Sequence, residues 1–161
     1  MTLDVIDTRI LEELQRNAKL TNVELAARVN LTPSPCLTRV RALEKAGYID
    51  RYVTLLDASR VGLGVSVFID VTLERQVERA LDAFERAMQR HPQVMECYLM
   101  TGESDYLLRV LVSDVPALER FIVDELSQIP GVANIRSSFS LKQVKYSTPR
   151  DDRSAAAFPR T

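Results

Sequence analysis

Residues 21–47, TNVELAARVNLTPSPCLTRVRALEKAG, decide the fold of the N-terminal part of the chain. Thr21 stands three residues before Glu24, which is the spacing of a capping box and predicts the start of a helix. The run 30–33, NLTP, interrupts this helix, and Ser34-Pro35 is typical of a cap followed by proline in the first turn of the next helix. Two short helices joined by a tight turn predict a helix-turn-helix.

The residues on either side extend this motif. Residues 4–17 place apolar side chains at helical spacing, with Asp4 as the expected cap and Asn17 as the expected stop. Residues 48–56 are rich in β-forming side chains on both sides of Arg51, which predicts a small hairpin or wing. The N-terminal part is therefore expected to hold three helices and a wing.

The second half of the chain alternates strand and helix patterns. Residues 65–73, VSVFIDVTL, alternate as a strand, and residues 77–90 have an amphipathic helix pattern. The order βαββαβ predicts an α+β fold of the ferredoxin-like type, whose helices cover one face of the sheet and leave the other open. The remaining strands are expected at 94–101, 106–112 and 132–145, and the second helix at 115–129.

The open face of this sheet predicts self-association. We expect it to carry Val65, Val67 and Ile69 in alternation and to pair with the same face of a second copy. In the last strand, alternation assigns Ile135, Ser137, Phe139 and Leu141 to the helix face and Arg136, Ser138, Ser140 and Lys142 to the open face.

Charge and composition restrict the function. The net charge of −1 does not indicate nucleic-acid binding overall, but residues 28–51 hold five basic against two acidic side chains, a local positive patch. No apolar run is long enough to span a bilayer and no signal peptide is visible, so a cytoplasmic location is expected. Cys36 and Cys97 have no CxxC spacing and His91 is the single histidine at an expected helix end, so no metal site, cofactor or catalytic group is predicted.

Two stretches, SPCLTRVRALEKAGYI at 34–49 and TGESDYLLRV at 101–110, resemble the Lrp/AsnC (feast/famine) family of prokaryotic transcription regulators. The resemblance continues through IPGV and RSSFSLKQVKYST to residue 148. It implies sequence-specific binding of double-stranded DNA, a small effector that is commonly an amino acid, and homodimers that often assemble to octamers. The implied parts are a winged helix-turn-helix DNA-binding domain at 1–60, a ligand-sensing and oligomerisation domain at 61–147, and a flexible tail at 148–161.

The helix expected from Ser34 has the division that a major-groove reader needs, an apolar back and a polar, partly basic front. Arginine can donate two hydrogen bonds to guanine, whereas serine and threonine suit phosphates or mixed base edges. The alternative is that the arginines only form a solvated helix face. Which arginine reads bases stays open, and Cys36 and Leu37 are assigned to the core. The candidate DNA-binding residues are Arg28, Ser34, Pro35, Thr38, Arg39, Arg41 and Arg51.

The turn that contains Gly102 and Asp105 joins two expected strands, and in the family the ligand loop lies here. Asp105 could meet the ammonium group of an amino acid, while backbone N–H groups of the turn meet its carboxylate. A purely structural turn is the alternative, because glycine and aspartate are ordinary turn residues. The candidate effector-binding residues are Gly102, Glu103, Ser104, Asp105, Ser138 and Ser140.

Two other classes of protein compete with this interpretation. An enzyme is possible because βαββαβ folds support many chemistries, but no nucleophile with a base, no metal cluster and no glycine-rich phosphate loop is visible in the sequence. An architectural DNA-wrapping protein is also possible, although it would not need an effector turn. A regulator and not an enzyme is therefore predicted.

Overall fold

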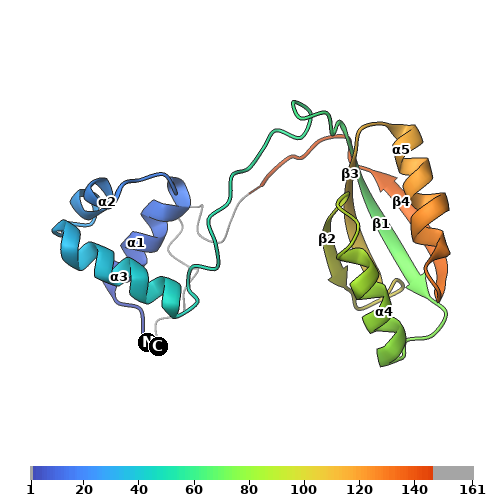
Figure 1. Ribbon diagram of the computed structural model, residues 1–161, viewed down its shortest axis with the longest axis horizontal. Helices are drawn as coiled ribbons and strands as arrows, with labels where there is room; N and C mark the ends of the chain where they lie inside the picture. The colour runs from blue at the N-terminus through green and yellow to red at the C-terminus, as the bar shows by residue number, and fades with distance from the viewer. Residues whose placement is uncertain (1, 147–161) are drawn as a thin grey trace. The chain divides into compact units, whose positions relative to one another are not determined.

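The computed structural model describes residues 2–146 (Figure 1). The chain forms two compact units: the first reaches Thr54, and the second is Leu55–Gln143. The tail expected at 148–161 lies outside the described residues. Within the part of the chain that is described, no helix is both long enough and apolar enough to cross a membrane.

The first unit holds the helices α1 (Val5–Arg16), α2 (Asn22–Arg28) and α3 (Pro33–Lys45). Both expected caps are confirmed as reciprocal capping boxes, one between Asp4 and Asp7 and one between Thr21 and Glu24. Each box satisfies backbone N–H groups that a helix start leaves without intrahelical partners. Buried side chains from all three helices form the core: Ile10, Leu11, Leu25, Ala26, Val29, Cys36 and Leu43.

Three details of this unit differ from the sequence prediction. Helix α3 begins at Pro33 with Thr32 as its cap, because proline fits the first helical position, where no N–H partner is needed. Leu37, assigned to the core, is exposed. Residues 48–56 form no strand, so the expected hairpin around Arg51 is wrong as regular structure; a lone two-stranded hairpin is only marginally stable.

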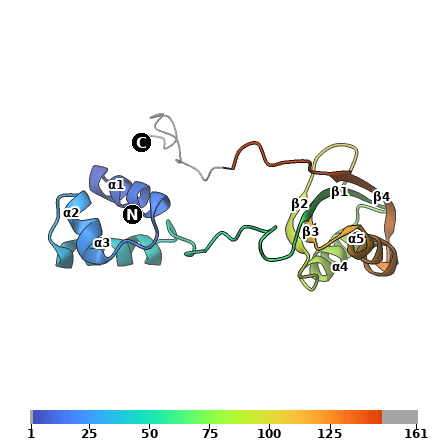
Figure 2. The same ribbon diagram turned by 90° about the horizontal axis from the view of Figure 1, so that it is seen from above.

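The second unit is the predicted βαββαβ arrangement. Its elements are β1 (Val65–Leu73), α4 (Glu78–Met88), β2 (Val94–Leu99), β3 (Tyr106–Val112), α5 (Val115–Arg120) and β4 (Val132–Phe139). Helix α5 continues through a π-helical turn, η1 (Phe121–Glu125), and a short 3-10 turn, η2 (Leu126–Gln128). The sheet is antiparallel throughout, with strand order β2-β3-β1-β4. Both helices lie on one face of the sheet, as Figure 2 shows.

The sheet faces correct the expectation for β1. Val67 and Ile69 are completely buried in the core against the helices, while Phe68 and Asp70 alternate with them on the other face. The prediction that Val65, Val67 and Ile69 lie on the open face is therefore wrong. The physical reason is that the uniformly aliphatic side of the strand faces the helices, where most apolar area is removed from water.

Strand β4 is shorter than predicted. It ends at Phe139 and not at Lys145, because pairing with β1 stops there. Ile135 packs against the core as predicted, but Phe139 is half exposed and Leu141 is 98% exposed. Both were expected to cover the helices; β4 is an edge strand, so its side chains have a neighbouring strand on one side only.

Candidate DNA-reading and effector surfaces

The turn between α2 and α3 fixes how the two helices meet. Asn30 has a φ of 58°, a left-handed conformation that asparagine tolerates better than most residues. Asn22 of α2 donates from its side chain to the carbonyl oxygen of Pro33 at 2.7 Å. Because Cys36 and Leu43 are completely buried, the back of α3 is held in the core and the opposite side of α3 faces solvent.

The exposed front of α3 carries four of the predicted DNA-binding residues, namely Ser34, Pro35, Thr38 and Arg41. The hydroxyl group of Thr38 donates to the carbonyl oxygen of Ser34 at 3.1 Å. Among the ion pairs of residues 2–146, none includes Arg41. The guanidinium group of Arg41 is thus both exposed and not engaged by a carboxylate.

Arg39 is placed differently. Its Nη1 atom lies 2.7 Å from a carboxylate oxygen of Asp4 and 2.7 Å from one of Asp7. The hydrogen bonds to Asp7 and then to Asp4 raise the pKa of Arg39. Since the Asp7 side chain is only 4% exposed, Arg39 supplies the positive charge for a buried carboxylate. Arg39 therefore connects α3 to the start of α1.

The two predicted phosphate-binding arginines lie outside α3. Arg28, in the last turn of α2, forms an ion pair with Glu13 of α1 at 2.9 Å, and this hydrogen bond is the main cause of the lowered pKa of Glu13. Arg51 is exposed in the irregular segment and lies 3.4 Å from Asp50. Both side chains are more than half exposed, so both can reach an approaching phosphate.

The predicted effector turn connects β2 to β3. The backbone N–H of Met100 donates to the carbonyl oxygen of Asp105 at 2.8 Å, which closes the turn. Gly102 has a φ of 131°, a conformation open to glycine and rare for other residues. Gly102 and Glu103 are exposed, so their backbone groups are accessible from solvent.

Asp105 is buried, with 5% exposure. Its carboxylate accepts hydrogen bonds from the backbone N–H of Leu73 at 2.6 Å and from the side-chain amide of Gln76 at 2.5 Å. Both donors are neutral, and no ion pair among the described residues includes Asp105. A buried carboxylate without a cationic partner attracts a positively charged group.

The remaining effector candidates lie on or near the open face. Ser104 donates to Asp70 of β1 at 3.2 Å, and the other oxygen of Asp70 lies 3.3 Å from Arg136. Ser138 stands opposite Phe68 in the ladder of β1 and β4, and the backbone N–H of Ser140 donates to Ser66 at 2.9 Å. The structure therefore brings Ser104 close to Asp70, while Ser138 lies further along β4 and Ser140 follows the end of that strand.

Two protein-family models match this chain. Residues 3–50 match a winged helix-turn-helix DNA-binding domain, and residues 66–150 match the Lrp/AsnC ligand-binding domain. The chain belongs to the Lrp/AsnC family. The family resemblance, the α+β fold with a helix-turn-helix domain of the winged class, and the function as a DNA-binding regulator with an effector domain are thereby confirmed, although residues 48–56 form no strand.

Curated relatives agree along almost the whole length of this Lrp/AsnC protein. The Bkd operon transcriptional regulator of Pseudomonas aeruginosa is 45% identical over 142 residues, which cover 88% of this chain and 93% of that protein. The leucine-responsive regulatory protein of Escherichia coli is 39% identical over 145 residues, covering 90% and 88%. Both are transcriptional regulators, which confirms the prediction of a regulator over an enzyme.

Solved structures give the same result. A transcriptional regulator from Neisseria meningitidis, in complex with L-Met, has a TM-score of 0.87 and 44% identity, and the match covers 91% of this chain and 95% of that chain. An AsnC family regulator from Agrobacterium tumefaciens has a TM-score of 0.85 and 35% identity, with 91% and 95% covered. The Lrp/AsnC architecture therefore extends through both domains.

Several contacts of this Lrp/AsnC chain were not predicted from its sequence. Asp7 was an ordinary first-turn residue in the sequence, and nothing local indicated that Arg39 would bind it across 32 residues. Gln76 lies in a connection without a motif, although it donates to Asp105. The one available signal for Asp70 was its position as an acid inside an otherwise apolar strand.

Proposed function

We propose that this Lrp/AsnC protein binds an operator duplex through paired α3 helices and that an amino acid bound beside the turn at Asp105 controls this binding. The single observation that carries the effector proposal is the buried carboxylate of Asp105, whose side-chain donors among residues 2–146, Leu73 and Gln76, are both neutral. The DNA proposal rests on the polar front of α3. As a regulator of transcription, the protein works in the cytoplasm, where its DNA lies.

In this proposal Arg41 reads a base edge in the major groove. Its guanidinium group is exposed, whereas that of Arg39 is engaged by two carboxylates. Arg39 then acts as a positioning residue that holds α3 against the start of α1. Its remaining N–H groups donate hydrogen bonds to the phosphate backbone of the DNA. Ser34, Pro35 and Thr38 line the groove-facing surface, and Arg28 and Arg51 contact phosphates.

The effector proposal depends on exchange of one donor at Asp105. The Gln76 side chain belongs to an exposed residue in the connection between β1 and α4, so it can move away when a ligand binds. The α-ammonium group of an amino acid then takes its place, as a charged donor instead of a neutral one. Backbone N–H groups of Gly102, Glu103 and Ser104 bind the carboxylate of the ligand.

A relative supports an amino acid as the effector class. The Neisseria meningitidis structure, 44% identical to this chain, is a complex with L-Met. An apolar amino acid fits the surroundings of the turn, because Leu99 and Met100 precede it and are exposed. Ser138 of β4 and Ser140, just after this strand, contribute hydroxyl groups in the assembled protein.

We also propose that the open face of the sheet forms a homodimer and that dimers assemble to an octamer. Phe68 at 38% exposure and Tyr98 at 51% exposure are large apolar side chains on this face. Pairs of opposite charge accompany them, Glu96 with Arg109 at 2.7 Å and Asp70 with Arg136 at 3.3 Å. Apolar side chains with a polar surround are typical of protein interfaces.

The experiment for the DNA part is enrichment of duplexes from a random-sequence pool by the purified full chain. The proposal predicts a pseudo-palindromic consensus, because paired recognition helices bind two related half-sites. Parallel thermal melting with each of the twenty amino acids identifies the effector, since a ligand that binds only the folded state raises the melting temperature. Enrichment without sequence preference would favour an architectural DNA-binding protein instead.

A further inference from the structure

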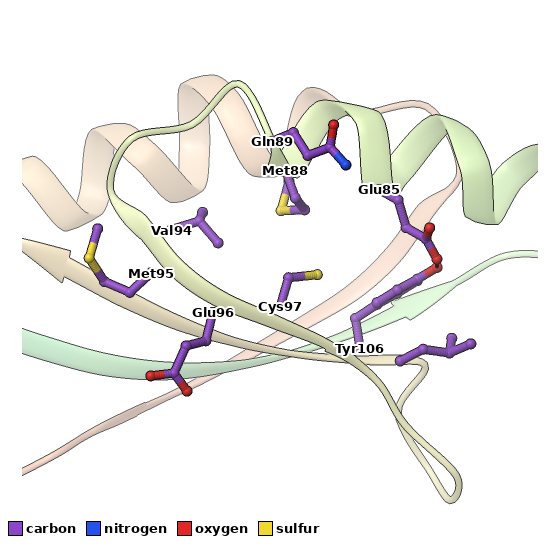
Figure 3. A pocket seen from close by; sticks show the side chains of 9 residues that line it. Glu85, Met88, Gln89, Val94, Met95, Glu96, Cys97 and Tyr106 are labelled. Atoms are coloured by element: carbon purple, nitrogen blue, oxygen red, sulfur yellow. Dashed lines mark hydrogen bonds between the residues drawn. The ribbon is translucent and has the colours of Figure 1, made fainter. Parts of the chain in front are cut away.

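A groove of about 430 Å³ lies between α4 and the edge strand β2, on the helix side of the sheet (Figure 3). Its volume falls within the range of about 300–1,000 Å³ that small-molecule sites occupy. The groove exists because β2 is the outermost strand: Cys97 is exposed, whereas Leu108, its partner on β3, is buried.

The charge in this groove has one sign. Two glutamates are among its nine lining residues, and none of the nine is a lysine, arginine or histidine. The carboxylate of Glu96 is not available to a ligand in the groove, because its side chain points away from the groove in Figure 3 and forms an ion pair with Arg109 at 2.7 Å. Glu85 does face the groove, and its carboxylate accepts a hydrogen bond from the Tyr106 hydroxyl at 2.9 Å.

Glu85 has no cationic partner among the ion pairs of residues 2–146. The hydrogen bond from Tyr106, whose ring is buried, fixes the carboxylate at the edge of the groove. A ligand cation can therefore pair with a carboxylate that is already oriented, which lowers the entropy lost on binding.

The other lining side chains are apolar except for the neutral amide of Gln89. Met88 and Val94 pack in or against the core, and Met95 borders the groove from β2. Burial, with a smaller contribution from the charge of Glu85, raises the pKa of Cys97 to about 11, so the thiol is neutral near pH 7 and acts as an apolar surface. A ligand carboxylate would meet no positive group here.

From these features we propose that the groove binds a small aliphatic amine. The ammonium group pairs with Glu85 beside the Tyr106 hydroxyl, and the hydrocarbon chain lies along Met88, Val94 and Cys97. Asp105 is not among the lining residues, and Leu99 is the one lining residue that the proposed effector site also uses, so the amine site has its own carboxylate and does not depend on the function proposed for the turn. An amino acid is disfavoured, because its carboxylate would face Glu85 without a counter-charge.

The test uses the full chain and two probes, pentan-1-amine and norleucine, which differ only by the α-carboxylate. The measurement is the rate at which Cys97 reacts with an aromatic disulfide reagent. Cys36 is completely buried and serves as the internal unreactive thiol, and Cys97→Ser gives the background. Pentan-1-amine is expected to slow the reaction at least threefold at saturation, whereas norleucine at the same concentration leaves the rate unchanged.

The variants separate a specific site from a general effect. Glu85→Gln still accepts the Tyr106 hydrogen bond but lacks the charge, and it is expected to weaken protection by the amine about fivefold, as for loss of one partly exposed ion pair. Glu119→Gln, the same charge change at an exposed position on α5, is expected to keep the parent affinity. If Glu85→Gln does not fold, Tyr106→Phe tests the same contact and is also expected to weaken protection.

Three results would overturn the proposal. Equal protection by norleucine would mean that the groove does not reject a carboxylate. Equal affinity of the parent, Glu85→Gln and Tyr106→Phe for pentan-1-amine would remove Glu85 from the site. Protection that appears without amine as the protein concentration rises would show that a second copy of the chain covers the groove instead.

Discussion

Arg39 of α3 binds both Asp4, the N-cap of α1, and Asp7 in the first turn of α1 through a single nitrogen atom, which lies 2.7 Å from each carboxylate. The contact joins the predicted recognition helix to the first helix of the chain. An arginine that the sequence alone offers to DNA is therefore already used inside the domain. Arg41, two residues later, is exposed and has no ion pair among residues 2–146, and for this reason we propose it as the arginine that contacts DNA.

The first prediction concerns stability. Arg39→Ala leaves the buried carboxylate of Asp7 without its cation, and this should lower the free energy of unfolding by about 1–3 kcal/mol. Arg41→Ala is the matched control, and its effect should stay within about 0.5 kcal/mol, as for an exposed residue that forms no ion pair within the described part of the chain. Urea unfolding of both variants measures the difference. Equal stability of the two would show that the Arg39 contacts contribute nothing.

The second prediction concerns DNA recognition. Arg41→Ala should weaken binding to the enriched duplex by about 1–3 kcal/mol and relax the preference at one base pair of each half-site. Fluorescence anisotropy with the parent duplex and single-base variants measures both effects. A uniform loss across all sequences would instead assign Arg41 to a phosphate.

The dimer prediction uses the open face of the sheet. Phe68→Asp places a charge where a second copy should bury an aromatic ring, so this variant should be monomeric where the parent is dimeric. Val123→Asp adds the same charge at an exposed position in the helical layer and should keep the parent assembly. Light scattering of the full chains decides, and a dimeric Phe68→Asp variant would move the contact to another surface.

The fourth prediction concerns pH. Asp114 caps α5, and the hydrogen bond from the backbone N–H of Ala117 is the main cause of its lowered pKa. Because the pKa of Asp114 in the folded state lies below its ordinary value of 3.8, the carboxylate stabilises the fold above that pH, and this contribution is lost as the pH falls through the folded-state pKa. Asp114→Asn keeps a side-chain acceptor but cannot titrate. Its urea midpoint should therefore fall less steeply than that of the parent as the solution is acidified below pH 3.8. Parallel curves for the two proteins would contradict this role of Asp114.

Local signals in the sequence predicted the helices and strands well where turn residues mark the ends of these elements. Strands β1 and β3 were predicted at 65–73 and 106–112, and the structure has Val65–Leu73 and Tyr106–Val112. The capping-box spacing of Thr21 and Glu24 placed the start of α2, and the cap residue Asp4 with the helical spacing of apolar residues placed α1. The local structure that such short-range patterns specify depends only on residues close together in the sequence.

Features that depend on distant partners were not predictable from local patterns. The face that β1 presents to the helices depends on which of its two sides α4 and α5 cover, and the end of β4 depends on where β1 stops pairing. The contact between Arg39 and Asp4 spans 35 residues, and that between Asp105 and Gln76 spans 29. The site residues are therefore placed by tertiary packing that no single segment encodes.

Whether an amino acid bound at Asp105 controls DNA binding is tested by measuring the affinity for the enriched duplex while each amino acid is titrated, in the parent and in Asp105→Asn. At least one amino acid should shift the duplex affinity of the parent by about 5- to 150-fold, the usual size of an allosteric coupling. Asp105→Asn should bind DNA normally without effector and show less than a tenth of the parent's effector affinity. If no amino acid changes the affinity of the parent, or if the variant responds as the parent does, the effector site is not at Asp105.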